Sequence, residues 1–216
     1  MNPIVLFGVF GAIWVGVYLF QQAAQRKRLE GYQAFATMHG LVFDPECTAT
    51  RAKVAGLFDA FTTWQRQKWR YGLSGTRGGA QFTAFEYCYL VGGGRGSHWH
   101  EVGAILWELP QGSLPQFAVA PESWWDKITE RLGWPDFDFP EDKAFSDDYL
   151  LRGADEAGVR GLFDASKRTF CVSHPGTYAA AAGNRLLWWR DESLPDPALL
   201  ESFLTEGDAF RQLFFK

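Results

Sequence analysis

The sequence predicts an α+β fold, with an N-terminal transmembrane helix followed by one compact domain of antiparallel β-hairpins packed with helices. Three observations predict it. Residues 4–20 carry no charge, which is typical of a membrane span. Residues 82–90 alternate in the manner of a strand, and residues 199–214 carry apolar side chains at helical spacing. We assign residues 1–25 to the anchor and residues 26–216 to the domain, because no low-complexity linker divides the latter.

The apolar run from Ile4 to Phe20 spans roughly 25 Å as a helix, near the lower limit for crossing a bilayer. A cleaved signal peptide is the alternative, but it would place basic residues before the apolar run. Here Arg26, Lys27 and Arg28 directly follow it. Because positive residues stay on the cytoplasmic side, they predict a single-pass protein of the bacterial inner membrane with a cytoplasmic C-terminal domain.

Small residues form a stripe along the predicted span, since Gly8, Ala12 and Gly16 lie four residues apart. Such a stripe lets two membrane helices approach closely, which favours a homodimer. The alternative is that glycine and alanine are simply common in membrane helices. Both interpretations stay open at the level of the sequence.

The first half of the domain is expected to contain a long hairpin. The N-terminal helix continues to His39, where Gly40 is placed to end it. A strand at 41–43 and a weak helix or irregular segment at 52–61 precede a loop-like segment at 72–79. Strands at 82–90 and 102–109 then pair around the glycine-rich tip at 92–97. A third strand is expected at 116–120, and Pro121 is expected to begin a helix that ends at Leu132.

The second half is expected to add helices and another hairpin. Short extended pieces at 137–139 and 149–152 precede a helix from Asp155 to about Lys167. Strands at 170–174, or longer, and at 186–190 are joined through a turn at 183–184. Asp196 and Pro197 begin the last helix. The hairpins should carry helices mostly on one face.

Composition argues against some classes of protein. A net charge of −4 is unfavourable for nucleic-acid binding, which needs a basic surface. Three widely spaced cysteines form neither a disulfide framework nor a zinc motif, as in a reducing compartment. Adjacent tryptophans at 124–125 and 188–189 would face opposite ways on strands. Either one ring of each pair lies at an interface, a groove or a membrane surface, or the sheet has core on both sides.

Candidate chemical groups are few. His98 and His100 would share a strand face and are weak metal candidates, but no acidic residue stands at the spacing that would complete a ligand set. The glycines at 92–96 lack the lysine and the following helix of a phosphate-binding loop. Cys171 and His174 would face opposite ways on a strand, which favours a buried thiol over a nucleophile. We therefore predict no cofactor and no metal, and the catalytic residues stay unknown.

Glu86 is the charged residue that the pattern singles out. It lies in mid-strand between Phe85 and Tyr87. If its face of the strand is buried, the carboxylate must be paired, and an Arg or Lys of a neighbouring strand would satisfy it.

Three short motifs are similar to those of an uncharacterised family of bacterial membrane-anchored proteins. They are the stretches at 85–89 (FEYCY), 114–122 (LPQFAVAPE) and 145–149 (FSDDY). The resemblance extends over about residues 25–215, and this chain has Glu86 where Asp is commoner in the family. Because that family has no assigned activity, the resemblance implies location and architecture and transfers no catalytic residue.

We interpret the chain as a membrane-anchored cytoplasmic interaction or scaffold domain, with the bilayer and an unknown protein as partners. One alternative is a membrane-tethered enzyme, hydrolytic in type, that uses groups around His98, His100 and Glu86. Another is a domain that binds a lipid or other apolar ligand in an aromatic groove. The enzyme alternative requires these polar groups to converge in one cavity.

Overall fold

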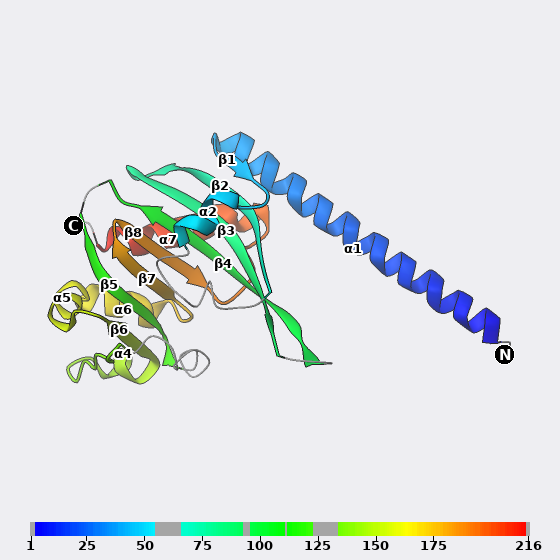
Figure 1. Cartoon of the computed structure of the whole chain (residues 1–216). Helices are drawn as coiled ribbons and strands as arrows, with labels where there is room; N and C mark the ends of the chain where they lie inside the picture. Colours follow the sequence, from blue (N-terminus) through cyan, green and yellow to red (C-terminus); the bar gives the residue numbers. More distant parts are fainter. Residues whose placement is uncertain (1–2, 55–65, 93–95, 111, 123–133, 215–216) are drawn as a thin grey trace.

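A computed structural model of the chain describes residues 3–54, 66–92, 96–110, 112–122 and 134–214, with side chains from Ile13 onward. Within these residues, eight strands form one antiparallel sheet in the order β1-β2-β3-β4-β8-β7-β5-β6 (Figure 1). The strands are β1 Val42–Asp44, β2 Gln67–Arg77, β3 Ala80–Val91, β4 His98–Glu108, β5 Leu114–Pro121, β6 Tyr149–Gly153, β7 Tyr178–Gly183 and β8 Arg185–Arg190. The helices are α1 Pro3–His39, α2 Thr48–Val54, α4 Lys143–Asp148, α5 Glu156–Leu162, α6 Ala165–Ser173, the 3-10 turn η3 Pro197–Leu199 and α7 Leu200–Gln212.

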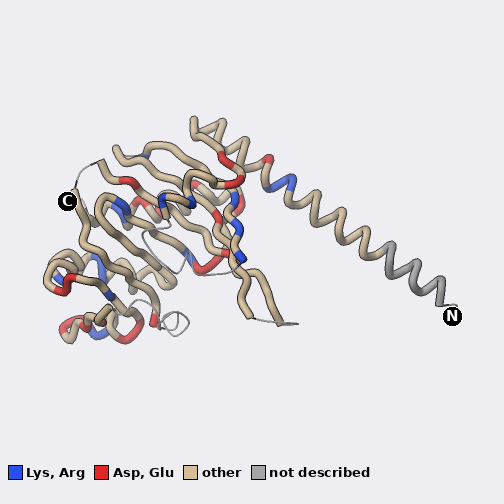
Figure 2. Tube along the Cα trace, viewed as in Figure 1, with Lys and Arg blue, Asp and Glu red and all other residues tan. Residues whose placement is uncertain are grey.

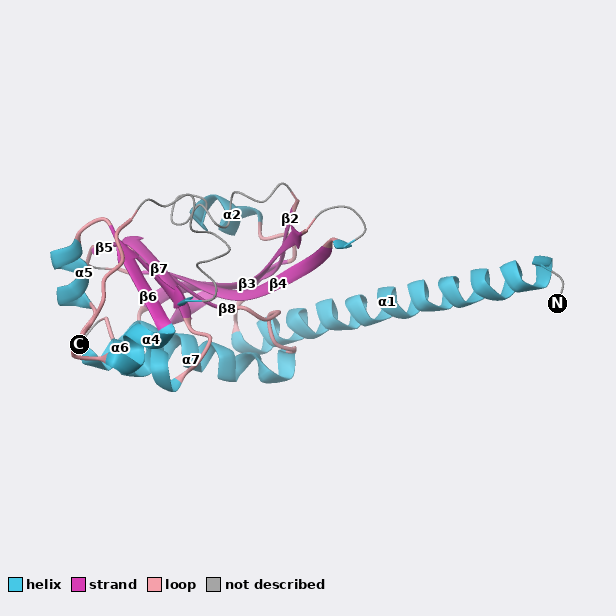
Figure 3. Ribbon diagram, turned by 90° about the horizontal axis from the view of Figure 1, so that it is seen from below, coloured by secondary structure: helices cyan, strands magenta, loops and turns pink. Residues whose placement is uncertain are grey.

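The sheet carries apolar core on both faces. The C-terminal part of α1, together with α4, α6 and α7, covers one face, and α2 lies over the other (Figure 3). We call these the helical face and the α2 face. Trp188 belongs to the core of the helical face and Trp189 to that of the α2 face, and both are fully buried. Of the two explanations for this tryptophan pair, core on both sides of the sheet is therefore correct. The pair at 124–125 lies outside the described residues.

Helix α1 is continuous through the predicted boundary between residues 25 and 26. It ends where expected, because Gly40 adopts φ +64° and the Leu41 N–H donates to the Ala36 carbonyl at 2.8 Å. Tyr32, Phe35 and Ala36 are buried against the domain. The N-terminal part of α1 projects away from the domain (Figure 1), with exposed apolar side chains from Ile13 to Phe20.

The described residues contain no helix that is both long and apolar enough to cross a membrane. The transmembrane prediction for residues 4–20 is thus not supported by the structure. The side chains of residues 1–12, including those at two positions of the small-residue stripe, Gly8 and Ala12, lie outside the described part of the chain.

Several predicted elements are confirmed. β3 and β4 form the long hairpin, with Phe85 opposite Ala104. β5 and β6 occur where extended segments were expected, and β7 and β8 pair through a turn at Gly183, which adopts φ +60°. The last helix is present as η3 followed by α7, although Asp196 makes no capping hydrogen bond with its side chain.

The predicted loop at 72–79 is wrong, since β2 runs through it. The glycines in this segment permit close approach between elements rather than a loop. A Cβ on Gly75 would lie 2.4 Å from Leu41 Cδ2, and one on Gly72 would lie 2.9 Å from the Asp44 carbonyl oxygen. The turn itself is confined to Gly78 and Gly79, at φ +56° and +77°.

The region from 155 to 174 also differs from the prediction. Asp164 accepts hydrogen bonds from the Ser166 and Lys167 N–H groups and begins a second helix, so one predicted helix becomes α5 and α6. The predicted strand at 170–174 is therefore the end of α6. Residues 137–139 form no strand, although Asp136 makes an isolated bridge with Arg152. Pro121 ends β5, and most of the helix predicted after it lies outside the described residues.

We expect Gly207→Ala to destabilise the domain. Gly207 brings α7 against the sheet, where an added Cβ would lie 2.5 Å from Ile105 Cδ1 and 3.0 Å from a ring carbon of Trp188. Such overpacking costs about 1–3 kcal/mol, which exceeds the gain of about 1 kcal/mol in helix propensity. Thermal and denaturant unfolding measure the effect. The matched control is Gly161→Ala in α5, where a Cβ meets nothing within 4 Å. Equal stability of the two variants would contradict this packing.

Candidate functional site

A buried ion cluster joins α1 to the sheet. Glu86 on β3 is 0% exposed. Its Oε1 lies 2.5 Å from Arg70 Nη2, and its Oε2 lies 2.8 Å from Arg28 Nη2. Arg70 stands directly opposite Glu86 in the β2–β3 register, whereas Arg28 comes from α1. The predicted pairing of Glu86 with a cation of a neighbouring strand is confirmed, and α1 supplies a second cation.

The same carboxylate also holds the segment between β8 and η3. The Leu194 N–H donates to Glu86 Oε2 at 3.1 Å, and Arg28 donates to the Leu194 carbonyl. The Tyr32 hydroxyl of α1 donates to the Pro195 carbonyl at 2.8 Å. Gly103 of β4 makes room for this segment, since a Cβ there would lie 2.9 Å from Leu194 Cα. α1, two central strands and residues 194–195 therefore meet at one carboxylate.

A β-bulge in β2 shapes the site. The β2–β3 register shifts between Arg70 and Leu73, and Tyr71 within the bulge adopts φ +59°. The bulge places Tyr71 on the helical face, although Trp69, two residues earlier, packs on the α2 face. Its ring lies 4.7 Å from that of Tyr32, and the Arg28 guanidinium lies 5.1 Å from its centroid. The bulge thus completes an aromatic wall around the ion cluster.

The electrostatics of the cluster favour its charged form. Burial is the largest single influence and lowers the pKa of Arg28 and of Arg70. The charge of Glu86, together with smaller contributions from neighbouring tyrosine, thiol and carboxylate groups, outweighs burial and raises both pKa values above the ordinary value. Removing one member of a buried ion pair leaves an uncompensated charge, which costs about 3–5 kcal/mol. The cluster therefore holds α1 in one orientation, because displacement of α1 would remove Arg28, one of the two cations that pair with the buried Glu86.

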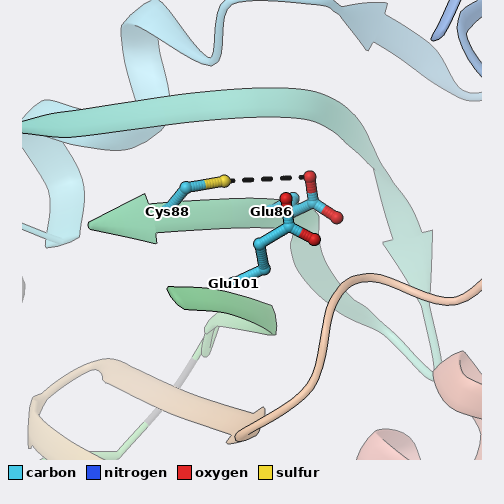
Figure 4. Close-up of side chains that lie close together, drawn as sticks. All are labelled: Glu86, Cys88 and Glu101. Atoms are coloured by element: carbon cyan, nitrogen blue, oxygen red, sulfur yellow. Dashed lines mark hydrogen bonds between the residues drawn. The ribbon is translucent and has the colours of Figure 1, made fainter. Parts of the chain in front are cut away.

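Glu86, Cys88 and Glu101 lie close enough to suggest a metal site, with one ligand atom of each within 4.8 Å of the others (Figure 4). A protein cation already occupies the centre of this group. Arg70 Nη2 lies 2.5 Å from Glu86, 2.8 Å from Glu101 and 3.1 Å from Cys88 Sγ. Burial raises the pKa of the Cys88 thiol to about 12, which opposes formation of a thiolate ligand. The arrangement suits a guanidinium rather than a metal ion.

The predicted histidine site lies on the other face of the sheet. His100 Nε2 is 2.6 Å from Asp191 Oδ1, and its ring lies 5.0 Å from that of Tyr89. His98, at the first position of β4, is exposed. Side-chain alternation places both histidines on the α2 face, whereas Glu86 and Glu101 point to the helical face. His98, His100 and Glu86 therefore do not converge in one cavity.

The residues predicted to set the membrane topology and to pack two helices together have different surroundings in the structure. Arg28 is half-buried in the ion cluster, while Arg26 is exposed and pairs with Glu30 at 3.0 Å. Lys27 is exposed. A Cβ on Gly16 would meet nothing within 4 Å, so this position of the predicted helix-packing stripe is open. Sequence reasoning missed the role of Arg28 because a basic residue beside an apolar run is ordinarily a topology signal.

Two shallow grooves lie near the start of β7. One, of about 390 Å³, is crossed by the Arg190–Glu206 ion pair and also includes Asp191, Glu192 and Phe203. The other, of about 410 Å³, carries Glu122, Asp147 and Asp148. Both include Pro175 and Gly176. Among the charged side chains on these walls acidic ones predominate, and one of them, Asp191, is the partner of the predicted histidine His100.

Glu86→Gln is expected to destabilise the protein by about 3–5 kcal/mol, because two half-buried guanidinium groups would lose the buried carboxylate that they share. The matched control is Glu101→Gln, which removes a carboxylate from the same Arg70. The Glu101 side chain is 39% exposed, so its loss should cost about 1 kcal/mol or less. Denaturant unfolding of the two variants measures the difference. Equal losses would mean that burial of Glu86 does not set the stability of this junction.

The thiols are expected to be unreactive in the folded protein. Burial raises the pKa of Cys47, Cys88 and Cys171 to about 12 each. At pH 8 the thiolate fraction is then about 10⁻⁴. Mass spectrometry after brief treatment with iodoacetamide should find no modification in native protein and three modified cysteines in urea. Rapid alkylation of one of these thiols in the folded protein would contradict this expectation and make that cysteine a candidate nucleophile.

Comparison with known proteins gives a likeness of fold. No protein-family model matches the chain, and no curated protein sequence does. The chain is similar in structure to the crystal structure of the mycobacterial trehalose monomycolate transport factor A, TtfA, with a TM-score of 0.56 and 13% sequence identity. The match covers 88% of this chain and 96% of that one. At this identity the likeness extends to the fold alone.

Proposed function

We propose that the chain is a membrane-attached interaction domain that works as a scaffold in a process handling lipid. The observation that carries the proposal is α1. It leaves the domain as a continuous helix, and its projecting part exposes Trp14, Val15 and Phe20 at 73%, 58% and 75%. Apolar side chains exposed along a protruding helix mark a surface that another apolar phase covers. Residues 4–20 are the segment that would enter the bilayer.

The ion cluster gives this attachment a defined geometry. Arg28 holds α1 on the sheet, and eight residues separate it from Phe20, which corresponds to about 12 Å of helix. The domain would therefore lie close to the membrane surface at a fixed orientation. A flexible linker would not transmit orientation in this way, and a fixed orientation suits a domain that presents one surface to a partner.

Orientation follows from the basic residues after the apolar run. Arg26 and Lys27 are exposed and free of the ion cluster, so they remain suited to the cytoplasmic side of a bacterial inner membrane. Arg28 contributes less to this signal because Glu86 neutralises it. Gly16 has open space around it, which supports a homodimer through the stripe it shares with Gly8 and Ala12.

The role as a scaffold is supported over that of an enzyme by the state of the polar groups. Glu86 is neutralised by two arginines, His100 is paired with Asp191 on the opposite face, and burial keeps the thiols protonated. The lipid connection is supported by fold, since TtfA is a trehalose monomycolate transport factor. We infer the class of process from that likeness, and not the same lipid.

Membrane attachment is tested by Val15→Asp, which places a charge in the apolar run. A carboxylate at such a position costs about 2.5–3.5 kcal/mol on insertion, or roughly a 100-fold shift in partition. The full-length protein should resist alkaline extraction from membranes, whereas the variant should be released. The matched control is Met38→Asp, on the docked part of α1, where the side chain is 80% exposed. It should stay attached.

In inverted inner-membrane vesicles, added protease should reach the domain without detergent. Protection of the domain would overturn the orientation and leave the attachment intact. Release of the wild-type protein by alkali would overturn the attachment itself.

A further inference from the structure

The β3–β4 hairpin extends beyond the rest of the sheet. β2 accompanies it as far as Arg66, whose carbonyl accepts the Leu90 N–H at 3.2 Å. From there the β3–β4 register continues, among the described residues in these two strands, with Leu90 opposite Trp99 and Val91 opposite His98. Figures 1 and 3, which view the molecule from directions 90° apart, both show this end projecting toward the same side as the N-terminal part of α1.

An aromatic residue and a cation lie together on this extension. Trp99 is 39% exposed, and Lys68 Nζ lies 4.2 Å from the centroid of its ring. Alternation with Glu101 puts Trp99 on the helical face, the face from which α1 projects. An indole with an apolar body and a polar N–H is suited to the zone of lipid headgroups, and the adjacent ammonium suits anionic headgroups.

Basic residues gather on this side of a chain whose net charge is −4. Arg26 and Lys27 on α1, and Arg66 and Lys68 at the base of the hairpin, are all exposed. Figure 2 shows the corresponding blue segments on α1 and near the hairpin. The acidic groove at Asp147 and Asp148 lies elsewhere in the fold. Near the hairpin, Asp191 pairs with His100 and Glu101 with Arg70, and on α1 Glu30 pairs with Arg26. The exposed cations on this side, Lys27, Arg66 and Lys68 among them, suit a partner surface that is anionic.

We propose that the Trp99–Lys68 pair of the β3–β4 hairpin is a second lipid contact, made with anionic headgroups of the membrane that α1 enters. The proposal rests on the proposed membrane attachment and extends it. The Glu86 cluster fixes α1 to β2 and β3, the strands that carry this extension and Lys68, so hairpin and helix approach the bilayer as one rigid unit. Attachment of α1 raises the effective concentration of lipid at the hairpin, and a weak contact suffices.

The test uses a fluorophore placed at the hairpin in the full-length protein. Ser97→Cys introduces an exposed thiol into a protein whose other three thiols are buried. The labelled protein is reconstituted in vesicles of phosphatidylcholine and phosphatidylglycerol that contain a lipid with a nitroxide headgroup. The matched control is Thr76→Cys, an exposed position at the opposite end of β2. We expect the nitroxide to quench the label at 97 and not the label at 76.

Substitution of the pair should reverse the quenching. Lys68→Gln removes one charge near an anionic surface, which corresponds to about a fivefold weaker contact, and Lys68→Gln with Trp99→Ala should abolish it. Vesicles of phosphatidylcholine alone should give weaker quenching. Both variants should stay bound to the vesicles through α1.

Other outcomes would separate this inference from the membrane attachment. An unquenched label at 97 in vesicle-bound protein would overturn the hairpin contact and leave the attachment of α1 standing. Protein that fails to enter vesicles would overturn the attachment. Self-quenching that follows the ratio of protein to lipid, without an effect of the nitroxide, would assign the hairpin to a second copy of the chain and overturn the lipid contact.

Discussion

The carboxylate of Glu86 is the group on which the arrangement of this protein depends. It is fully buried at the centre of the sheet, and burial of a lone charge is too costly to persist. Arg70 from the adjacent strand and Arg28 from α1 compensate it, and the Leu194 N–H satisfies a further lone pair. Each partner comes from a different part of the chain. The burial of the Glu86 carboxylate therefore fixes the positions of α1, of β2 and of the segment that leads to η3.

Because of this constraint, α1 is both a projecting helix and a packed part of the domain. The helix is a projecting rod from Ile13 to Phe20 and a packed element of the core from about Arg28 to His39, with no break between them. The Tyr32 ring packs against Tyr71 of the β2 bulge in a tilted arrangement, and its hydroxyl donates a hydrogen bond to the Pro195 carbonyl. The direction in which α1 leaves the domain is thus set by the same contacts that stabilise the sheet. In the proposed membrane attachment, such a rigid exit would present a constant surface of the domain to lipid and to partners.

The polar residues that were candidates for catalysis lie on opposite faces of the sheet. The helical face holds the Glu86 cluster, and the α2 face holds His100 with Asp191. Arg70 lies among the carboxylates and the thiol that otherwise have the spacing of a metal site. Each of these groups already has a protein partner of opposite charge or a hydrogen-bond partner. Among the described residues, these polar groups therefore contribute to holding the strands, α1 and the segment before η3 together.

The sequence by itself determined the α+β class, the β3–β4 hairpin, the end of α1 at Gly40 and the need of Glu86 for a cation, because these follow from local alternation, glycine conformation and the cost of burying charge. It could not determine the strand character of residues 72–77 or the division between α5 and α6. The first depends on the close approach of Asp44 in β1 to Gly72 and of Leu41, in the turn after α1, to Gly75. The second depends on capping by Asp164. Only the tertiary structure decided that Arg28 belongs to the ion cluster, since a residue 58 positions from Glu86 meets it through packing of α1 on the bulged strand, which no local pattern records.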